Sequence, residues 1–566
     1  MTTQPTQQLQ AGLIQSDLVI YPSRQGRRIV AYLDHREGDY CGRPFVIVTP
    51  KYGETKKNNL QLAYYLAANG LNVLRFDHTF HPGESDGEIV HFTFLSAIDD
   101  ILASVDYLAG RFDVESVILV ANSLSVRPAI RAARLDARIR RFISVVGVVN
   151  FQRTLRVVYQ RDLVADHLGG VQHGVTDILG YEVDLIPFMD SCTREHLHDF
   201  EGTMSDLHGM RADSIFFYAE NDIWVDSEEV RRLAAAERRI CLRRIEGVMH
   251  ELRENPEAAE HVLKEIVFAC VHGRLATPAE LSAIVIPAKK VFLQQNRLER
   301  ERMREARPLR LSEREFWQHY LSKYDILENV GDYQGYLDLI GECLGPIHDG
   351  DILFDVGCGN GLFGIWCLRH LLARQSPSSL PPPIYIGLDL TAKGLGSALE
   401  RHVATEERAW AGRSTLGLIY QQYDLERVET LRAGSGKDPL PFTDGTFDKI
   451  CCSLLISYLQ QPEALLAELR RVLKLGGSIV VSSMKPFCDL SLIYRDLVSE
   501  QKTDDELGRA RDLLTAAGAI RLREEEGHYT FYFGQELAEL IHRAGFREVQ
   551  LFRSFGNQAN VVSARR

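Results

Sequence analysis

The turn around Ser123 has the residue types and the setting of a catalytic nucleophile. It follows the strand-like run SVILVA (116–121) and precedes a helix-like segment with Pro128 in its first turn. A serine at the apex of a strand–turn–helix unit is typical of a nucleophile elbow, which needs small residues two positions before and after the serine. Here these are Ala121 and Ser125 instead of the usual glycines. The sequence therefore predicts a serine nucleophile in a turn that departs from the glycine pattern.

A serine nucleophile requires a base, and the base requires a carboxylate to orient it. Asp222 follows the strand-like run SIFFYAE (214–220), and His250 follows a later strand-like run. Since the carboxyl ends of parallel strands meet at one edge of a sheet, we predict that Ser123 is the nucleophile, His250 the base and Asp222 its partner. Taken singly, the three residues have ordinary alternatives, namely a turn serine, a helix N-cap and a loop histidine.

The negative charge on an attacked carbonyl oxygen needs backbone N–H donors. We predict one donor at Leu124, directly after the nucleophile, and one on the loop after the run PFVIVTP, at Lys51 or Tyr52. His78 and His81 follow the next strand-like run. Loop histidines are mostly structural or solvated, so a catalytic part for these two is the less favoured alternative.

A second chemical motif, ILFDVGCGNGLFG, lies in the other half of the chain. It holds Asp355, Gly357, Gly359 and Gly361 in the spacing D-x-G-x-G-x-G, directly after a strand-like run and before a helix-like one. Glycines at such a first strand–helix turn let the backbone approach a ligand closely. Taken alone, the turn suits either a dinucleotide or S-adenosylmethionine.

Two further carboxylates follow strand-like runs in this half. Asp389 ends the run IYIGLDL, where it is placed to bind ribose hydroxyls, and Asp424 lies in YQQYDL, where it suits an adenine amino group. The stretch between Asp355 and Asp389 is longer than the roughly 20 residues of a plain unit. The Pro-rich insert at 374–383 accounts for the excess.

Strand-like and helix-like segments alternate in both halves, which predicts an α/β fold with parallel sheets and helices on both faces. The first half contains strand-like runs at 44–50, 72–77, 116–121, 141–149 and 214–220. Residues 151–212 interrupt this rhythm without a clear strand, and we predict a helical lid there. The second series begins near 352–357.

At 566 residues the chain is long enough for two or three domains. We predict a first domain over 1–285, a charged helical linker over 286–314 and a second domain over 315–566. The linker is dense in Arg and Glu, which favours a solvated helix. A calmodulin-target or nucleic-acid-binding helix is the alternative.

The composition argues against several classes of protein. The net charge of −12 disfavours a nucleic-acid-binding surface. No apolar run approaches the ~20 residues that span a bilayer, and the N-terminus lacks the features of a signal peptide. The ten cysteines include no CxxC pair, and the adjacent Cys451 and Cys452 fit a buried strand. We therefore predict no metal site and a reducing, cytoplasmic setting.

The first half carries the segments VANSLSVR, GLNVLRFDHTFHPGESDG, SVVGVVNFQRTL, AENDIWV and GVMHELREN. In these segments, over roughly residues 15–275, it resembles the acyl transferase (acyl-carrier-protein thioesterase) of the bacterial bioluminescence operon. That family consists of α/β hydrolases that release a fatty acid from a thioester through an acyl-serine. The resemblance implies the same fold, an acyl carrier protein or CoA thioester as the partner, and the same roles for Ser123, Asp222 and His250.

The second half carries LPFTDGTFDKICCSLLISYL and PEALLAELRRVLKLGGSIVVSS after the glycine turn. With these segments it resembles the class I S-adenosylmethionine-dependent methyltransferases, from about residue 315 to 566. The resemblance implies a Rossmann-like domain with S-adenosylmethionine as the cofactor. A dehydrogenase should instead show a G-x-G-x-x-G turn and lack the later segments.

Together the two halves predict a bifunctional enzyme. The first domain would release or transfer an acyl chain, and the second would methylate the freed acid to a methyl ester, or a related acyl or polyketide intermediate. Near the expected acceptor site, Ser453, Ser457 and Tyr458 include no evident general base, which favours an acceptor that is already nucleophilic, such as a carboxylate. The alternative is a catalytically silent acyl-binding or carrier-docking scaffold fused to a small-molecule methyltransferase.

Overall fold

The chain forms two compact units, each with its own sheet and core. The first comprises Met1–Arg307 with Glu525–Gly527, and the second comprises Pro308–Glu524 with His528–Arg566. The structure, a computed structural model, describes residues 14–38, 40, 42–159, 161–178, 181–248, 250, 256–306, 313–322, 324–373, 381–409, 415–428, 439–486, 488 and 517–566. Most of the Pro-rich insert therefore lies outside the described residues.

An eight-stranded sheet forms the centre of the first unit, in the order β1-β2-β4-β3-β5-β6-β9-β10. Its strands are β1 Ile14–Pro22, β2 Arg28–Arg36, β3 Phe45–Val48, β4 Asn72–Phe76, β5 Val117–Asn122, β6 Ile139–Val145, β9 Asp213–Ala219 and β10 Ile240–Ile245. The strands from β4 to β10 run parallel, which confirms the predicted α/β class. The first two strands pair antiparallel at this edge, which was not predicted from the sequence.

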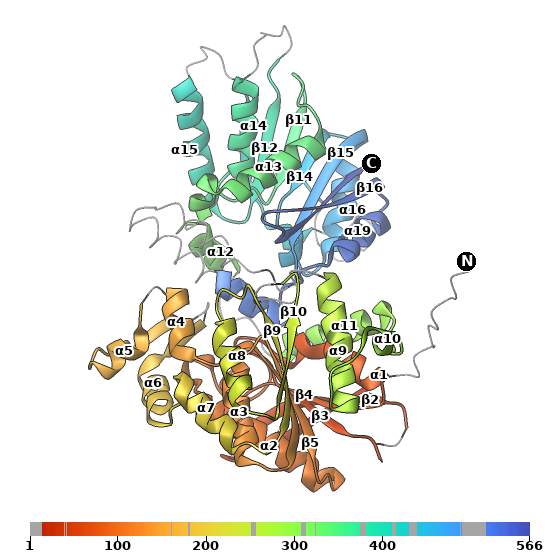
Figure 1. The fold of residues 1–566 in the computed structure, drawn as a ribbon. Coiled ribbons are helices and arrows are strands. Elements are labelled where there is room, and N and C mark those ends of the chain that lie inside the picture. The colour runs from red at the N-terminus through yellow and green to blue at the C-terminus, as the bar shows by residue number, and fades with distance from the viewer. Residues whose placement is uncertain are drawn as a thin grey trace. The chain divides into compact units, whose positions relative to one another are not determined.

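Helices cover both faces of this sheet (Figure 1). One face carries α1 Leu60–Ala68 and α9 Pro256–His272, and the other carries α2 Phe94–Phe112, α3 Val126–Leu135 and α8 Ser227–Ala236. Strand β3 is buried on both faces: Val46 and Val48 pack into one core, and Phe45 and Ile47 into the other. Central parallel strands read as continuous apolar runs for this reason.

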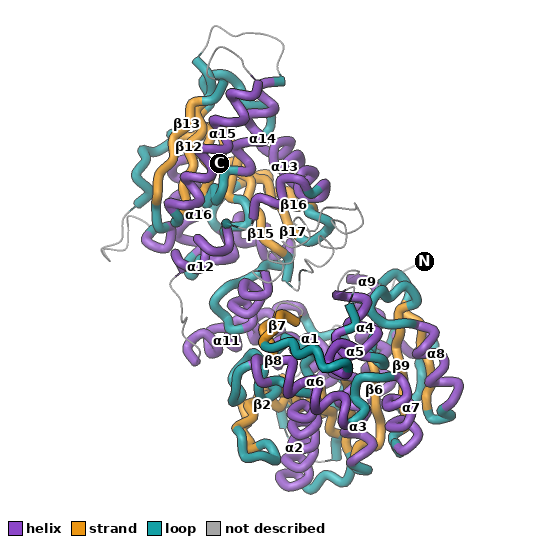
Figure 2. Tube along the Cα trace, turned by 90° about the vertical axis from the view of Figure 1, so that its left-hand side faces the viewer, coloured by secondary structure: helices purple, strands orange, loops and turns teal. Residues whose placement is uncertain are grey.

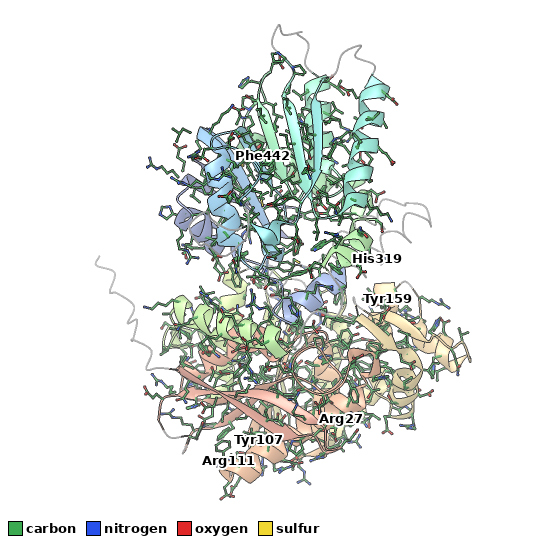
Figure 3. All side chains as sticks on the ribbon, turned by 180° about the vertical axis from the view of Figure 1, so that it is seen from behind. Arg27, Tyr107, Arg111, Tyr159, His319 and Phe442 are labelled. Carbon is green, nitrogen blue, oxygen red and sulfur yellow. The ribbon has the colours of Figure 1, made fainter. Side chains whose placement is uncertain are left out.

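The edge strand β1 is fastened to helix α2 by aromatic stacking. The rings of Tyr21 and Tyr107 lie 4.5 Å apart and are nearly parallel. Tyr107 lies one turn before Arg111 on this helix (Figure 3). The hydroxyl of Tyr21 also lies 2.7 Å from that of Ser104. These contacts anchor an edge strand that was not among the strands predicted from the sequence.

Residues 151–212 contain more than the predicted helical lid. The helices are α4 Phe151–Tyr159, α5 Leu163–Leu168, α6 Leu185–Arg194 and α7 Phe200–Gly209. A hairpin of β7 Val175–Ile178 and β8 Tyr181–Asp184 lies beside α6, so the expectation of no strand here is wrong (Figure 2). Short strands of mixed polarity are hard to recognise without their partners.

Helix α7 belongs to the helical layer of the sheet instead of a lid. Its Asp206 is fully buried and forms ion pairs of 2.6–2.8 Å with Arg127, Arg131 and Arg134 of α3. A carboxylate that receives three guanidinium groups is held in place by charge-assisted hydrogen bonds. The lid therefore ends before residue 200.

The second unit is built on a seven-stranded sheet in the order β13-β12-β11-β14-β15-β17-β16. Its strands are β11 Ile352–Val356, β12 Ile384–Asp389, β13 Gly417–Gln422, β14 Phe447–Cys452, β15 Leu473–Met484, β16 Arg547–Ser554 and β17 Ala559–Arg565. Five strands run parallel, and the last two form an antiparallel hairpin. The α/β class predicted for this half is confirmed.

The helices of this unit frame its sheet. They are α12 Glu313–Leu321, α13 Gly331–Leu344, α14 Leu362–Leu372, α15 Ala392–Ala409, α16 Pro462–Val472 and α19 Gly534–Arg543. Phe354 and Phe447 stack within the core on one side of the sheet, and Phe442, labelled in Figure 3, meets both rings edge-to-face. Cys451 and Cys452 are buried in β14, as predicted.

Helix α11 Lys289–Ala306 forms where the charged linker was predicted, but it is not simply solvated. Its Glu299 is 1% exposed and lies 2.6 Å from Nη2 of Arg75, a fully buried residue of β4. Arg75 also pairs with Asp34 of β2 at 2.6 Å. Composition alone could not show which charged residue of this helix meets a buried partner. The first unit thus extends past the predicted boundary at 285.

The buried Glu299 contact predicts a large difference between two glutamates of α11. Glu299→Ala should lower the free energy of unfolding of the first unit by about 3 kcal/mol, because it leaves the buried Arg75 with one carboxylate instead of two. Glu301→Ala is the matched control, since its side chain is 43% exposed and pairs with the exposed Arg297. That change should cost less than about 0.5 kcal/mol in chemical denaturation. Equal effects would contradict a docked helix.

Candidate active site

Ser123 occupies a strained turn at the carboxyl end of β5. It begins the short helical turn Ser123–Ser125, which leads directly into α3. Its φ of +54° lies in the left-handed region, which residues other than glycine and asparagine seldom adopt. The backbone N–H of Val148 donates to the Ser123 carbonyl at 3.0 Å and helps to hold this conformation. The turn presents the serine side chain at the edge of the sheet.

The residue two positions after the serine explains why glycine is not needed there. The Ser125 hydroxyl accepts from the Asn122 N–H at 3.2 Å and donates to the Asn122 carbonyl at 2.8 Å. It also lies 3.0 Å from Oγ1 of Thr49, at the end of β3. Ala121, on the other side, is 1% exposed and pairs with Ser144 of β6. The hydroxyl thus joins the turn to the neighbouring loop.

The structure brings the three predicted residues into one hydrogen-bonded line. Oγ of Ser123 lies 2.7 Å from Nε2 of His250, and Nδ1 of His250 lies 2.8 Å from Oδ2 of Asp222. The other oxygen of Asp222 accepts from the backbone N–H groups of Trp224 at 2.8 Å and Val225 at 3.0 Å. The Trp224 ring packs 4.7 Å from the His250 ring. A base in this arrangement can take the serine proton while the carboxylate fixes its tautomer.

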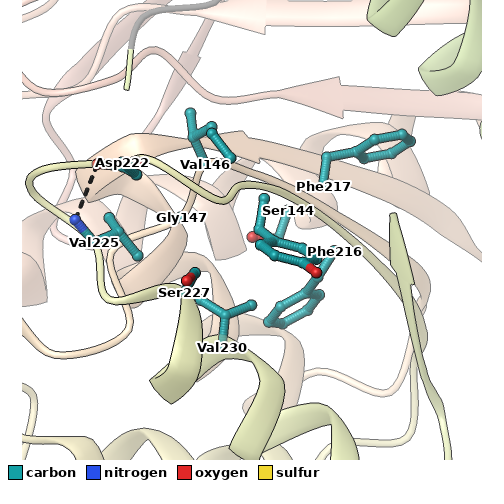
Figure 4. A pocket seen from close by; sticks show the side chains of 11 residues that line it. Ser144, Val146, Gly147, Phe216, Phe217, Asp222, Val225, Ser227 and Val230 are labelled. Carbon is teal, nitrogen blue, oxygen red and sulfur yellow. Dashed lines mark hydrogen bonds between the residues drawn. The ribbon is translucent and has the colours of Figure 1, made fainter. Parts of the chain in front are cut away.

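Asp222 borders a small cavity between β6, β9 and α8. The cavity is narrow, with room for little more than a water molecule. Figure 4 shows Asp222 at its rim, with the hydrogen bond from Val225 and a lining that is mostly apolar. The lining residues include Val146, Phe216 and Val230. The Asp222 side chain is only 2% exposed, and the backbone N–H groups of Trp224 and Val225 hold the oxygen that does not face the histidine.

The two predicted oxyanion donors lie on segments that the Thr49–Ser125 contact joins. Leu124 directly follows the serine in the turn and is 6% exposed. Tyr52 lies on the loop after β3, and the next residue, Gly53, has a φ of +76°. A Cβ on Gly53 would lie 2.2 Å from the ring of Tyr181, whose hydroxyl donates to the Gly53 carbonyl. The loop conformation is therefore fixed by contact with the lid hairpin.

The left-handed turn predicts different stabilities for two inactive variants. Ser123→Gly and Ser123→Ala both remove the hydroxyl, but only glycine relieves the cost of a positive φ. We expect the glycine variant to exceed the alanine variant by about 1 kcal/mol in free energy of unfolding, measured by denaturant titration. Equal stabilities would show that the turn carries no strain.

The glycine turn of the second unit has the shape of a ligand cradle. Gly357, Gly359 and Gly361 all have positive φ, at +74°, +52° and +80°. A Cβ on Gly361 would lie 2.7 Å from Cβ of Ala398, so no other residue fits there. Asn360, within the turn, is 3% exposed, and its Nδ2 has no hydrogen-bond partner among the described residues. An unpaired buried donor beside bare backbone is consistent with a site for a polar ligand.

The carboxylates predicted for this site lie at the ends of adjacent parallel strands. Oδ2 of Asp389, at the end of β12, accepts from the Gly359 N–H at 2.9 Å. Its Oδ1 accepts from the N–H and hydroxyl of Thr391 at 2.8 and 2.7 Å. Asp424 follows β13 and accepts from the Glu426 N–H at 3.1 Å. Sequence reasoning missed Asn360 and Thr391, for which only their positions beside the motif residues gave a signal.

Asp355 has a different environment from the other motif residues. Its carboxyl is 2% exposed and accepts from the Tyr385 hydroxyl at 2.5 Å. Burial, and to a lesser degree the charge of Asp389, raise the pKa of Asp355 to about 7. The side chain thus has a hydrogen-bond partner inside the sheet, which the spacing of the motif did not indicate.

This raised pKa predicts a specific dependence of stability on pH. The folded state keeps the Asp355 proton up to about pH 7, whereas an ordinary aspartate with a pKa of 3.8 loses it much earlier. Stability from this group is therefore complete below pH 3.8 and is lost as the pH rises to about 7. Relative to Asp355→Asn, we expect the wild-type free energy of unfolding to fall by about 1 kcal/mol per pH unit in this window. If the free energies of unfolding of the wild type and of Asp355→Asn changed equally with pH, Asp355 would not be buried in its neutral form.

Two negative findings apply to the part of the chain that the structure describes. Within it, no three side chains of His, Cys, Asp or Glu gather as a metal site. No described helix combines the length and the apolar character that a bilayer crossing requires.

Comparison with known proteins identifies relatives of each half. A family model described as acyl transferase matches residues 44–272, and one described as methyltransferase domain matches residues 325–551. Curated acyl transferases are similar to the first half. The one from Photobacterium phosphoreum is 26% identical over 40% of this chain and 74% of its own length. The one from Photorhabdus luminescens is 30% identical over 37% of this chain and 68% of its own length.

Solved esterase structures also align with the first half. Est1E from Butyrivibrio proteoclasticus, with ferulic acid bound, is 17% identical and covers 45% of this chain and 99% of its own, with a TM-score of 0.38. An esterase from Pyrococcus furiosus is 15% identical and covers 45% of this chain and 89% of its own, with a TM-score of 0.33.

Proposed function

Because the chain belongs to the acyl transferase family through residues 44–272 and has a methyltransferase domain after them in the sequence, we propose that Ser123 accepts an acyl group from a thioester. The observation that supports this role is the line from Ser123 through His250 to Asp222, with contacts of 2.7 and 2.8 Å. The α/β-hydrolase fold of the first unit, followed by a Rossmann-like methyltransferase domain, is consistent with it. The thioester would be that of an acyl carrier protein or CoA.

In the acylation step, Oγ of Ser123 attacks the thioester carbonyl while Nε2 of His250 takes its proton. Asp222 accepts from Nδ1–H and stabilises the charged imidazole. The backbone N–H groups of Leu124 and Tyr52 would bind the oxygen on which negative charge develops. As the carbon–sulfur bond breaks, the proton passes from His250 to the leaving thiol.

Water or another acceptor then releases the acyl group. His250 takes the proton of the attacking molecule, and the acyl–oxygen bond of the acyl-serine breaks. The same proton returns to Oγ of Ser123, so the enzyme is restored. With water the product is a free carboxylic acid.

For the second unit we propose S-adenosylmethionine as the cofactor. The turn Gly357–Gly361 would hold it, with the Asp389 carboxylate on the ribose hydroxyls and Asp424 on the adenine amino group. Asp355 would support the turn from inside the sheet. The unpaired Nδ2 of Asn360 and the three left-handed glycines fit a polar ligand that lies against backbone. When bound, S-adenosylmethionine supplies an electrophilic methyl group.

We propose the freed carboxylate, or a related acyl intermediate, as the methyl acceptor. A carboxylate is already nucleophilic and needs positioning more than a base. In the second unit the Tyr336 hydroxyl lies 2.6 Å from the hydroxyl of Ser453 and 2.6 Å from that of Ser482, so it hydrogen-bonds both serines. Covalent linkage of the two activities raises the effective concentration of the intermediate acid.

The product spectrum tests this proposal. Wild-type protein is incubated with a panel of acyl thioesters and methyl-labelled S-adenosylmethionine, and the products are identified by mass spectrometry. We expect a labelled methyl ester. Ser123→Ala should lower acyl release by at least about a thousandfold. Gly361→Val should abolish the label but leave the free acid, because a branched side chain cannot fit beside Ala398.

Two other outcomes would change the assignment. Unlabelled acid as the sole product would support acyl release by the first unit and contradict methylation of the carboxylate. If no thioester is consumed and a fluorophosphonate probe does not label Ser123, the first unit is a silent acyl-binding scaffold instead of an enzyme.

A further inference from the structure

Three rings beside the proposed oxyanion loop carry polar atoms without partners. Tyr52, His78 and His81, here called the His–Tyr cluster, lie on the loops after β3 and β4. The rings of Tyr52 and His81 are 5.7 Å apart, and those of His78 and His81 are 5.5 Å apart. The Tyr52 hydroxyl and Nε2 of His78 are buried and have no hydrogen-bond partner among the described residues, and the backbone of Glu54 leaves one ring nitrogen of His81 without a partner. Three such atoms in one place are unusual in a folded protein.

His78 has its proton fixed by a buried carboxylate. Its Nδ1 lies 3.2 Å from Oδ2 of Asp100, which is fully buried and also accepts from the N–H and hydroxyl of Thr79. Because a carboxylate only accepts, Nδ1 carries the proton. In the neutral ring, Nε2 is then an acceptor directed away from Asp100.

His81 is a neutral ring. It is 1% exposed, and burial, together with the nearby His78, holds its pKa well below the usual value. A neutral imidazole offers one N–H donor and one lone pair. With the Tyr52 hydroxyl, the His–Tyr cluster therefore presents both donors and acceptors.

Apolar side chains surround these polar atoms. The ring of Phe92 lies 4.7 Å from that of His81 and 5.6 Å from that of Tyr52. Phe188 of the lid helix α6 contacts Phe92 at 6.3 Å, and Tyr181 of the lid hairpin contacts Tyr52 at 5.8 Å. The cluster thus lies in an aromatic environment whose walls come partly from the lid.

The cluster is also linked to the proposed nucleophile through the sheet. Tyr52 lies on the loop that begins at Thr49, and Thr49 contacts Ser125 in the nucleophile turn at 3.0 Å. Strand β3 lies between β4, which leads to the histidines, and β5, which leads to Ser123. A group on the acyl chain close to its thioester end would therefore come near the cluster.

We propose that the His–Tyr cluster is a subsite for a hydroxyl group on the acyl chain, close to the thioester carbon. This inference rests on the proposed acyl transfer at Ser123 and names its substrate class. A hydroxyl both donates and accepts, which matches the mixed set of atoms. An anionic group would be less favourable because the buried carboxyl group of Asp100 contacts His78. An unsubstituted chain would bury the same atoms without partners, and a site built for a hydroxyl discriminates against such a chain.

Substrate preference tests this subsite. Hydroxyacyl and unsubstituted acyl thioesters of equal length are compared, with the hydroxyl moved one carbon at a time from the thioester end. We expect kcat/KM of the best hydroxyacyl substrate to exceed that of the unsubstituted one by about tenfold or more. His81→Phe should reduce this ratio to within about twofold, chiefly through KM of the hydroxyacyl substrate. His91→Phe, at an exposed histidine on the next element, is the matched control and should keep the ratio.

The outcomes separate this inference from the proposed function. Equal turnover of both substrate types by wild-type protein would overturn the subsite while acyl transfer still holds, and this comparison needs no variant. Binding of the same thioesters to Ser123→Ala, by calorimetry, tests the subsite even if Ser123 is not a nucleophile. Tighter binding of the hydroxyacyl compound supports the subsite, and equal binding overturns it. Failure of the proposed function is recognised independently: wild-type protein would then neither turn over any thioester nor be labelled at Ser123 by the fluorophosphonate probe.

Discussion

The left-handed backbone at Ser123 is the constraint on which the first unit depends. A serine does not keep a φ of +54° unless its surroundings impose it. The Val148 N–H holds its carbonyl, and the Ser125 hydroxyl ties the turn to itself and to Thr49. These bonds come from three loops at the carboxyl edge of one parallel sheet. The same edge carries Asp222 and His250, so the geometry that strains the serine also aligns its partners.

The second unit also has left-handed backbone at the carboxyl edge of its sheet, but at glycines instead of a serine. Its first strand–helix turn takes these conformations at Gly357, Gly359 and Gly361, where they cost little. The bare backbone there leaves room for a ligand, whereas the serine turn directs a side chain at His250. Carboxylates at the ends of β12 and β13 complete this edge. One architectural rule, with ligands at the carboxyl ends of parallel strands, thus places two different sites.

Sequence reasoning predicted the parts of the molecule that rest on local order. Ser123, Asp222 and His250 each follow an apolar run, and parallel strands must bring such positions together. It missed the features that depend on distant partners. The hairpin β7–β8 and strand β1 are half-exposed, and they can be recognised as strands only from their pairing with other strands. The burial of Glu299 depends on Arg75, and the His–Tyr cluster depends on which nitrogen atoms are left without partners in the fold. The spacing of residues in the sequence indicates neither the burial of Glu299 nor the His–Tyr cluster.

The central claim is that an acyl group passes through Ser123, and intact-protein mass spectrometry after brief mixing with an acyl thioester tests it most directly. The account predicts a mass increase equal to the acyl group, located on the peptide that contains Ser123. The adduct should be absent from Ser123→Ala and should form more slowly in Asp222→Asn, where His250 loses its orienting carboxylate. Consumption of the thioester at the wild-type rate by Ser123→Ala, without any acyl-protein, would contradict the account.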